Sequence, residues 1–315
     1  MGMVEPAGSR PRVLQSLFLL CIGGLRMIRK FSALALLLLL AASCGAVLEQ
    51  KTPEQQREHR LALVLGGGGA RGFAHVGVIR ELEAEKIPIH LIVGVSVGSL
   101  VGALYADSAD SFDLEWKAFQ IEKKDIFDLS LFNIQRSLAK GEALREYLNR
   151  HLRSRNIEDL KIPLAIVAVD LKTGTRVVFT QGPLSEAVRA STALPGVFEP
   201  VPWGEKLLVD GGVMGNLPPE VAEDLGADVI VGVNIAKGRS EFKAEPPGPL
   251  AVILESIGIM GGELIRLNRS RFDVLIEPDV GSVGIMDFDH KRELMEAGRQ
   301  AARKEIPKIR AAMGL

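Results

Sequence analysis

Two stretches of sequence decide the fold of this chain: LALVLGGGGARG at residues 61–72 and IVGVSVG at residues 92–98. Each begins with a short, continuously apolar run, which is typical of a strand buried on both faces of a sheet. Each then turns at glycines into a segment with the composition and spacing of a helix. Two strand–turn–helix units in succession predict a parallel sheet covered by helices.

The same alternation continues along the rest of the chain. Further apolar runs predict strands at residues 162–169, 176–180, 206–209, 228–234 and 272–276. Helices are expected over residues 73–85, 97–106, 217–225, 250–268 and 290–312, and a polar helical stretch over residues 111–155. The sequence therefore predicts an α/β fold with a mostly parallel central sheet flanked by helices.

The second turn places Ser96 between Gly94 and Gly98. A serine on a sharp strand-to-helix turn needs small residues two positions away on each side, because larger side chains would collide with the strand and the helix. This spacing predicts a nucleophile elbow that exposes the Ser96 hydroxyl at a helix N-terminus. Taken alone, the motif also fits a serine that merely caps a helix.

The first turn supplies a row of backbone N–H groups at Gly67, Gly68 and Gly69, followed by Arg71 and Gly72. Its G-x-G-x-x-G spacing also matches a dinucleotide-binding turn, which would need an acidic residue at the end of the second strand. That strand ends at Ser96 instead. We therefore expect the glycine amides to form an oxyanion hole, with Arg71 adding positive potential.

Two residues compete for the role of general base. Asp210 follows an apolar strand and precedes Gly211 and Gly212, so we expect it at the carboxyl edge of the sheet, where ligands bind in such folds. His290 is the alternative, since it is late enough in the chain for the order serine, acid, histidine. The early position of Ser96 and the glycine cradle favour Asp210.

These motifs, in this order, resemble those of the patatin-like phospholipases. The segment ASTALP at residues 190–195 is similar to a further block of that family, and the resemblance covers about residues 61–225. It implies a three-layer fold, a Ser96–Asp210 dyad, esters of fatty acids such as membrane lipids as substrates, and no cofactor. A histidine-dependent esterase, a nucleotide-binding protein and a non-catalytic lipid-binding lipoprotein remain the alternatives.

Residues 1–43 have the order of a leader: basic residues, then an apolar run at 31–42, then small residues, with Met27 as a possible true start. Ala-Ala-Ser-Cys at residues 41–44 resembles a bacterial lipobox. We expect lipidation at Cys44, a tether over residues 44–60, and a catalytic domain over 61–315. The expected location is a bacterial cell envelope, with Gly45 favouring the outer membrane.

Composition narrows the function classes. A net charge of -1 and 5% aromatic residues argue against a nucleic-acid partner. Both cysteines, Cys21 and Cys44, precede the expected domain, which excludes a disulfide framework or a cysteine-based metal site there. The five histidines lack metal-ligand spacing, so we expect no metal site.

Overall fold

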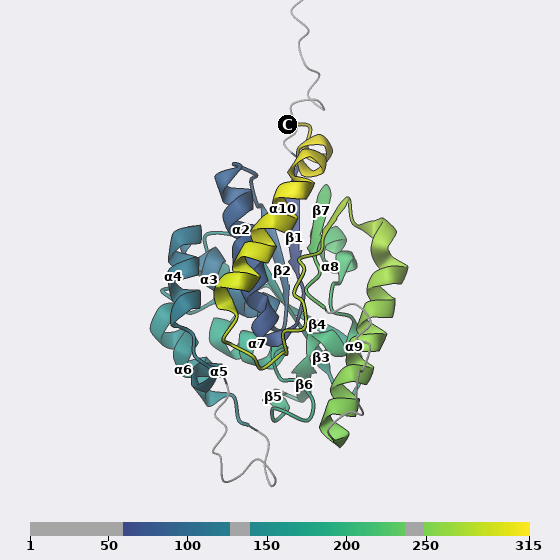
Figure 1. The fold of residues 1–315 in the computed structure, drawn as a ribbon. Helices are drawn as coiled ribbons and strands as arrows, with labels where there is room; N and C mark the ends of the chain where they lie inside the picture. Colours follow the sequence, from purple (N-terminus) through teal and green to yellow (C-terminus); the bar gives the residue numbers. More distant parts are fainter. Residues whose placement is uncertain (1–58, 127–138, 237–247) are drawn as a thin grey trace, which may run out of the picture. The chain divides into compact units, whose positions relative to one another are not determined.

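An eight-stranded sheet forms the middle layer of the computed structural model, which describes residues 59–126, 139–236 and 248–315 (Figure 1). The strand order is β5-β6-β3-β2-β1-β7-β8, and β4 pairs with β3. The strands are β1 (Leu61–Leu65), β2 (Leu91–Val95), β3 (Leu164–Asp170), β4 (Thr175–Phe179), β5 (Val201–Trp203), β6 (Lys206–Asp210), β7 (Val229–Val233) and β8 (Val274–Ile276). The pairs β3–β2, β2–β1, β1–β7 and β7–β8 are parallel, whereas the pairs β3–β4, β3–β6 and β5–β6 are antiparallel. The predicted, mostly parallel sheet is confirmed.

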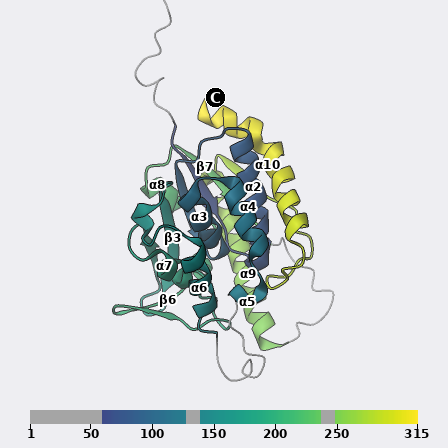
Figure 2. The ribbon, with the colours of Figure 1, turned by 90° about the vertical axis from the view of Figure 1, so that its left-hand side faces the viewer.

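Helices cover both faces of this sheet. They are α2 (Phe73–Ala84), α3 (Val97–Ser108), α4 (Ser111–Gln120), α5 (Lys123–Ile126), α6 (Glu142–His151), α7 (Leu184–Ser191), α8 (Pro219–Asp224), α9 (Pro249–Asn268) and α10 (Lys291–Met313). Short 3₁₀ helices are η1 (Gly69–Gly72), η2 (Ile157–Asp159), η3 (Gly211–Met214) and η4 (Arg269–Arg271). Figure 2 views the side on which α3, α4, α6 and α7 lie.

The buried strands alternate between two cores. Leu61, Leu63 and Leu65 of β1 belong to a large cluster with residues of α2, α3, α4, α6, α7 and α10. Ala62 and Val64 belong to a smaller cluster with residues of α8 and α9. This alternation is the period of two of a strand, and both faces are apolar because helices cover both. The result is the expected three-layer arrangement.

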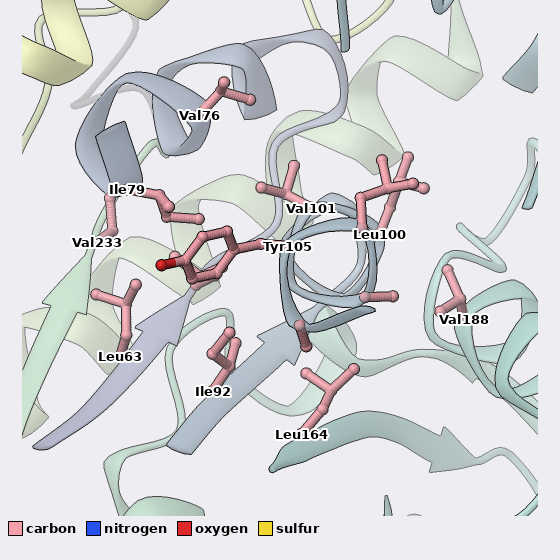
Figure 3. Packing of buried hydrophobic residues seen from close by; sticks show 14 of the residues in the cluster. Leu63, Val76, Ile79, Ile92, Leu100, Val101, Tyr105, Leu164, Val188 and Val233 are labelled. Carbon is pink, nitrogen blue, oxygen red and sulfur yellow. The ribbon is translucent and has the colours of Figure 1, made fainter. Parts of the chain in front are cut away.

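The larger core sits beneath α3. Figure 3 shows Ile92 of β2 and Leu164 of β3 beside α3, whose Leu100 and Val101 face the surrounding helices. All four side chains are buried. This packing fixes α3 against the sheet and so fixes the turn from which α3 begins.

The polar stretch at residues 111–155 is not one helix. It contains α4, α5 and α6, and residues 127–138 lie outside the described residues. Asp110 begins α4 by accepting from the N–H groups of Phe112 and Asp113, and Gly141, at φ 74°, precedes α6. Helix α7 and the short strand β5 were not predicted.

Candidate active site

Strand β3 brings the two candidate catalytic residues together. β4 pairs with residues 166–170 of β3, β2 with residues 164–167, and β6 with residues 168–170. Because β4 overlaps both of the others, β2 and β6 share the opposite edge of β3, one after the other. Val95 at the end of β2 lies opposite Val167, and Asp210 at the end of β6 lies opposite the next residue. The carboxyl ends of β2 and β6 therefore face each other along β3, which places Ser96 next to Asp210.

Ser96 stands at the sharp turn between β2 and α3. Its backbone has φ 55° and ψ −126°, a conformation that costs a non-glycine residue about 1–3 kcal/mol. A Cβ added at Gly94 would lie 2.5 Å from the Ser99 Cα, and one at Gly98 would lie 2.1 Å from the Leu65 carbonyl oxygen. Only glycine fits these two positions, which is the geometry of a nucleophile elbow.

Two buried serines hold this turn in place. The Ser191 Oγ accepts from the Ser96 N–H at 2.9 Å and donates to the Val167 carbonyl at 2.7 Å. The Ser99 Oγ donates to the Ser96 carbonyl at 2.6 Å. Both backbone groups of Ser96 are thereby satisfied, so the strained turn is held from two sides and the Ser96 side chain is left free for chemistry.

The Asp210 carboxyl is buried, with 3% of the residue exposed. Burial raises the pKa of Asp210 to about 6, while hydrogen bonding to the Ser96 hydroxyl and the Gly212 N–H acts in the opposite direction. Oδ1 accepts from the Gly212 N–H at 2.8 Å. Oδ2 is buried and has no hydrogen bond of normal geometry within the described residues. An unsatisfied carboxylate oxygen beside a serine hydroxyl is suited to accept its proton, and such bonds often tighten only when substrate binds.

Asn216 ties the glycine cradle to the loop that follows Asp210. The Gly67 N–H donates to the Asn216 Oδ1 at 3.1 Å, and the Asn216 Nδ2 donates back to the Gly67 carbonyl at 2.9 Å. A Cβ added at Gly67 would lie 3.0 Å from the Ser96 Cβ, so the cradle runs directly beside the serine. Because Asn216 already takes the Gly67 N–H, that amide is engaged and does not point to an oxyanion.

Gly68 and Gly69 keep their amides available. No acceptor in the part of the chain that the structure describes takes the N–H of either residue. Gly69 has φ 58°, and an added Cβ would lie 2.2 Å from the Ile285 carbonyl oxygen, so no other residue fits there. Arg71 donates from Nε to the Val283 carbonyl at 2.8 Å. Burial lowers the pKa of Arg71, and Glu255 of α9 acts against this.

A cavity of about 1010 Å³ contains the predicted site. Ser96, Asp210, the glycine cradle and Arg71 all line it. Its other walls are mainly apolar and include Val76, Leu100, Val101, Leu104, Leu114, Ala118, Ile121, Leu144, Leu194, Val197 and Phe198, with Ala251, Leu254, Ile257, Ile259 and Ile265 from α9. A cavity of this size and polarity suits a long apolar ligand with one polar group at the catalytic end.

No histidine of the described residues lines this cavity. The exposed His290 instead lies 2.9 Å from Glu293 and 3.4 Å from Asp287. His75 is fully buried, burial lowers its pKa to about 4, and its neutral ring contacts the Gly66 carbonyl at 2.8 Å. The structure thus keeps His290 away from the role of base and uses His75 to support the cradle.

The remaining predicted residues are placed as follows. Gly72 ends η1, and Gly211 and Gly212 begin η3 directly after Asp210. Within the described ranges, no group of three His, Cys, Asp or Glu side chains is arranged to hold a metal ion. Cys44, the leader and nearly all of the tether lie outside the described residues, so those assignments stay predictions.

Comparison with known proteins agrees with this arrangement. Residues 63–223, just over half of the chain, match the family model described as patatin-like phospholipase. The chain belongs to the patatin-like phospholipase family. It is 35% identical over 183 residues to mouse patatin-like phospholipase domain-containing protein 6, covering 56% of this chain and 13% of that protein.

This patatin-like chain is also similar to bacterial proteins. It is 32% identical over 271 residues to an uncharacterized NTE family protein of Mycobacterium tuberculosis, covering 78% of this chain and 46% of that protein. Both of these relatives are therefore more than twice as long as the segment they share with it. VipD from Legionella pneumophila has a similar structure, with a TM-score of 0.50 and 15% identity over 82% of this chain and 69% of that chain. That likeness shows the shared fold.

Two residues of this patatin-like site have structural roles that the sequence did not predict. Ser191 lies in the ASTALP segment, and Asn216 lies just after the Asp210 turn. Their contacts join residues that are 95 and 149 positions apart, respectively. Nothing in the local sequence of either residue points to its partner.

Proposed function

We propose that this protein is a lipid acyl hydrolase that works through a covalent acyl-enzyme on Ser96. One observation carries the proposal: the Ser96 hydroxyl lies beside the buried Asp210 carboxyl, next to free glycine amides, in an apolar cavity. A nucleophile, a base and oxyanion donors in one site are the requirements of acyl transfer. Family membership supports the same chemistry.

The first half of the reaction forms the acyl-enzyme. The Ser96 Oγ attacks the ester carbonyl carbon while the Asp210 Oδ2 accepts its proton. The carbonyl oxygen becomes an oxyanion, which the N–H groups of Gly68 and Gly69 stabilise, and the N-terminus of α3 adds a favourable field. When the tetrahedral intermediate collapses, the ester C–O bond breaks and Asp210 returns the proton to the leaving alcohol.

The second half releases the fatty acid. Asp210 accepts a proton from a water molecule as the water oxygen attacks the acyl carbonyl carbon. The same amides stabilise the second oxyanion, and collapse breaks the bond to the Ser96 Oγ, which regains its proton from Asp210. A single carboxyl group thus acts as base and acid in both halves. Its pKa of about 6 lies near neutral pH, where general acid–base groups work best.

The proposal includes a membrane-anchored location. In it, Cys44 carries the lipid anchor of an exported bacterial lipoprotein, and the following residues tether the catalytic domain near its substrate. The apolar run at residues 31–42 followed by Ala-Ser-Cys supports this. Replacing Cys44 with Ser should abolish lipid attachment, as judged by intact mass, and should lower the share of the protein found in the membrane fraction.

Hydrolysis of a series of fatty acyl esters by the full chain tests the activity. We expect Ser96→Ala and Asp210→Ala each to lower kcat/KM by about 10³-fold or more. Ser108→Ala, which changes a buried serine of α3 outside the cavity, and His290→Ala should each stay within about twofold of the unaltered protein.

A fluorophosphonate probe gives an independent readout of the same site. It should label the unaltered protein and leave the Ser96→Ala protein unlabelled. Full activity in the Asp210→Ala protein, or loss of activity in the His290→Ala protein, would contradict the proposed dyad.

A further inference from the structure

The outer side of α9 is the main exposed apolar surface of the described residues. Thirteen large hydrophobic residues are exposed in the part of the chain that the structure describes, and six of them belong to α9. We call these six the α9 apolar face: Leu250, Val252, Ile253, Ile259, Met260 and Leu267, which are 41–63% exposed. Exposed apolar surface gathered on one element marks an interaction site.

This face carries no charge over its first three turns. Glu255 is the only charged residue between Pro249 and Met260. It lines the cavity, where its charge acts to raise the pKa of Arg71. The next charges, Glu263 and Arg266, pair with each other at 2.6 Å. A partner bound through this face must therefore be recognised by apolar contact.

The opposite side of the same helix forms a wall of the Ser96 cavity. Leu254, Gly261 and Ile265 line the cavity at helical spacing. Of the α9 apolar face, Ile259 also lines the cavity, whereas Val252, Ile253 and Met260 do not. Helix α9 also packs against η3, whose Val213 and Met214 are 39% and 37% exposed. Two further exposed apolar side chains therefore lie on an element that contacts α9.

We propose that the α9 apolar face rests on a lipid bilayer, so that an ester passes from the membrane into the cavity beside it. This inference rests on the proposed function, because it takes the contents of the cavity to be a lipid. A helix that lies in the membrane interface buries its apolar face roughly 5–10 Å deep at the boundary between headgroups and acyl chains, and its binding strengthens with the apolar area that it buries. Figure 1 shows α9 along the right-hand edge of the view, outside the sheet.

The expected tether is long enough for this position. Among the helices of the described residues, none, including α9, is long and apolar enough to cross a membrane. Residues 45–60 lie between Cys44 and β1, and fully extended they span roughly 50 Å. The 20-residue helix α9 is about 30 Å long. A lipid anchor at Cys44 would therefore leave the domain free to turn this face to the bilayer.

The test compares two multiple variants in the full chain. Val252→Ser, Ile253→Ser and Met260→Ser together remove apolar area from the α9 apolar face without touching the cavity wall. Phe112→Ser and Trp116→Ser, at 69% and 68% exposure on α4, form the matched control. Two rates are measured: hydrolysis of an ester embedded in phosphatidylcholine vesicles, and hydrolysis of a short-chain ester dissolved as monomers.

We expect the α9 variant to lose about tenfold or more on the vesicle ester and to stay within about twofold on the dissolved ester. The α4 variant should keep both rates. Equal loss on both esters, no loss on the vesicle ester, or a loss confined to the α4 variant would overturn the proposal. Native mass spectrometry that shows a dimer for the unaltered protein and a monomer for the α9 variant would also overturn it, because the face would then bind a second copy.

Hydrogen exchange separates this inference from the proposed function. In the Ser96→Ala protein, which leaves vesicles intact, phosphatidylcholine vesicles should slow exchange within residues 249–268 and leave residues 111–120 unchanged. Should the unaltered protein cleave neither ester, the proposed function fails, and this measurement still decides whether α9 meets the bilayer. Unchanged exchange in α9 overturns the inference even for an active hydrolase.

Discussion

Replacing Asp210 with Asn should stabilise the protein while it abolishes acyl transfer. The pKa of Asp210 rises from 3.8 to about 6 on folding, mainly because the carboxyl is buried. That is a shift of about two units at 1.36 kcal/mol each, so the ionised carboxylate costs the folded state about 3 kcal/mol. Asn keeps the shape of the carboxyl group without the charge.

The sign and the pH range follow from linkage. The folded pKa lies above the unfolded value, so the cost is absent below about pH 3.8 and grows as pH rises through about 6. Asp210→Asn should therefore exceed the unaltered protein by up to about 3 kcal/mol in free energy of unfolding at pH 8. About half of that gain should remain at pH 5.

Urea unfolding followed by circular dichroism at both pH values measures this difference, provided the m-value is unchanged. Asp170 provides a control of opposite sign. It is also a buried aspartate at a strand end, but hydrogen bonds from the N–H of Leu207 at 3.1 Å and from the Thr173 hydroxyl at 2.8 Å lower its pKa. Its stabilisation is present above the unfolded pKa and lost as pH falls, so Asp170→Asn should destabilise the protein at pH 8. If the Asp210→Asn protein is less stable than the unaltered protein at pH 8, or if its gain is the same at the two pH values, the buried Asp210 carboxylate does not destabilise the folded state.

We make one further prediction for the base, for each of the two positioning residues and for the glycine turn. Because Asp210 must be ionised to accept a proton, kcat/KM for a dissolved ester should fall about tenfold per unit below a midpoint near pH 6, and a profile flat to about pH 4.5 would contradict this. Asn216→Ala should lower kcat more than it raises KM, by roughly 10-fold or more, because Gly67 loses both side-chain hydrogen bonds; an unchanged kcat would rule out this positioning role. Ser191→Ala leaves the Ser96 N–H and the Val167 carbonyl without their partner, so thermal unfolding should show a loss of about 2–4 kcal/mol, and a loss below about 0.5 kcal/mol would argue against it. Gly69→Ala should remove activity on every ester, since its Cβ would meet the Ile285 carbonyl oxygen; full activity would show that the turn can shift.

Local sequence was sufficient for much of the architecture. Continuously apolar runs predicted β1, β2 and β3, because strands buried on both faces have no polar side. The three-residue strand β5 was missed because it is too short to show a period of two. The break of residues 111–155 into separate helices was also missed, although Gly141 stands at one break. A helical pattern does not reveal where tertiary packing ends one helix and starts the next.

For the site, sequence determined the parts whose geometry is local. Gly94 and Gly98 dictate the turn at Ser96, since nothing larger fits against α3 and β1. Gly69 likewise requires a left-handed backbone that glycine alone adopts without strain. The position of Asp210 at a strand end was also predicted, and the family resemblance paired it with Ser96.

Only the tertiary structure decided which of these parts meet. Ser96 and Asp210 lie together because β2 and β6 share one edge of β3, and strand order is a property of the whole sheet. The contacts of Ser191 and Asn216 likewise span long stretches of chain. The physical reason is that turns and strand periods arise from neighbouring residues, whereas long-range pairing arises from how layers pack. The two sides of α9 follow the same rule, because an apolar helix shows which side it buries only when the sheet lies against it.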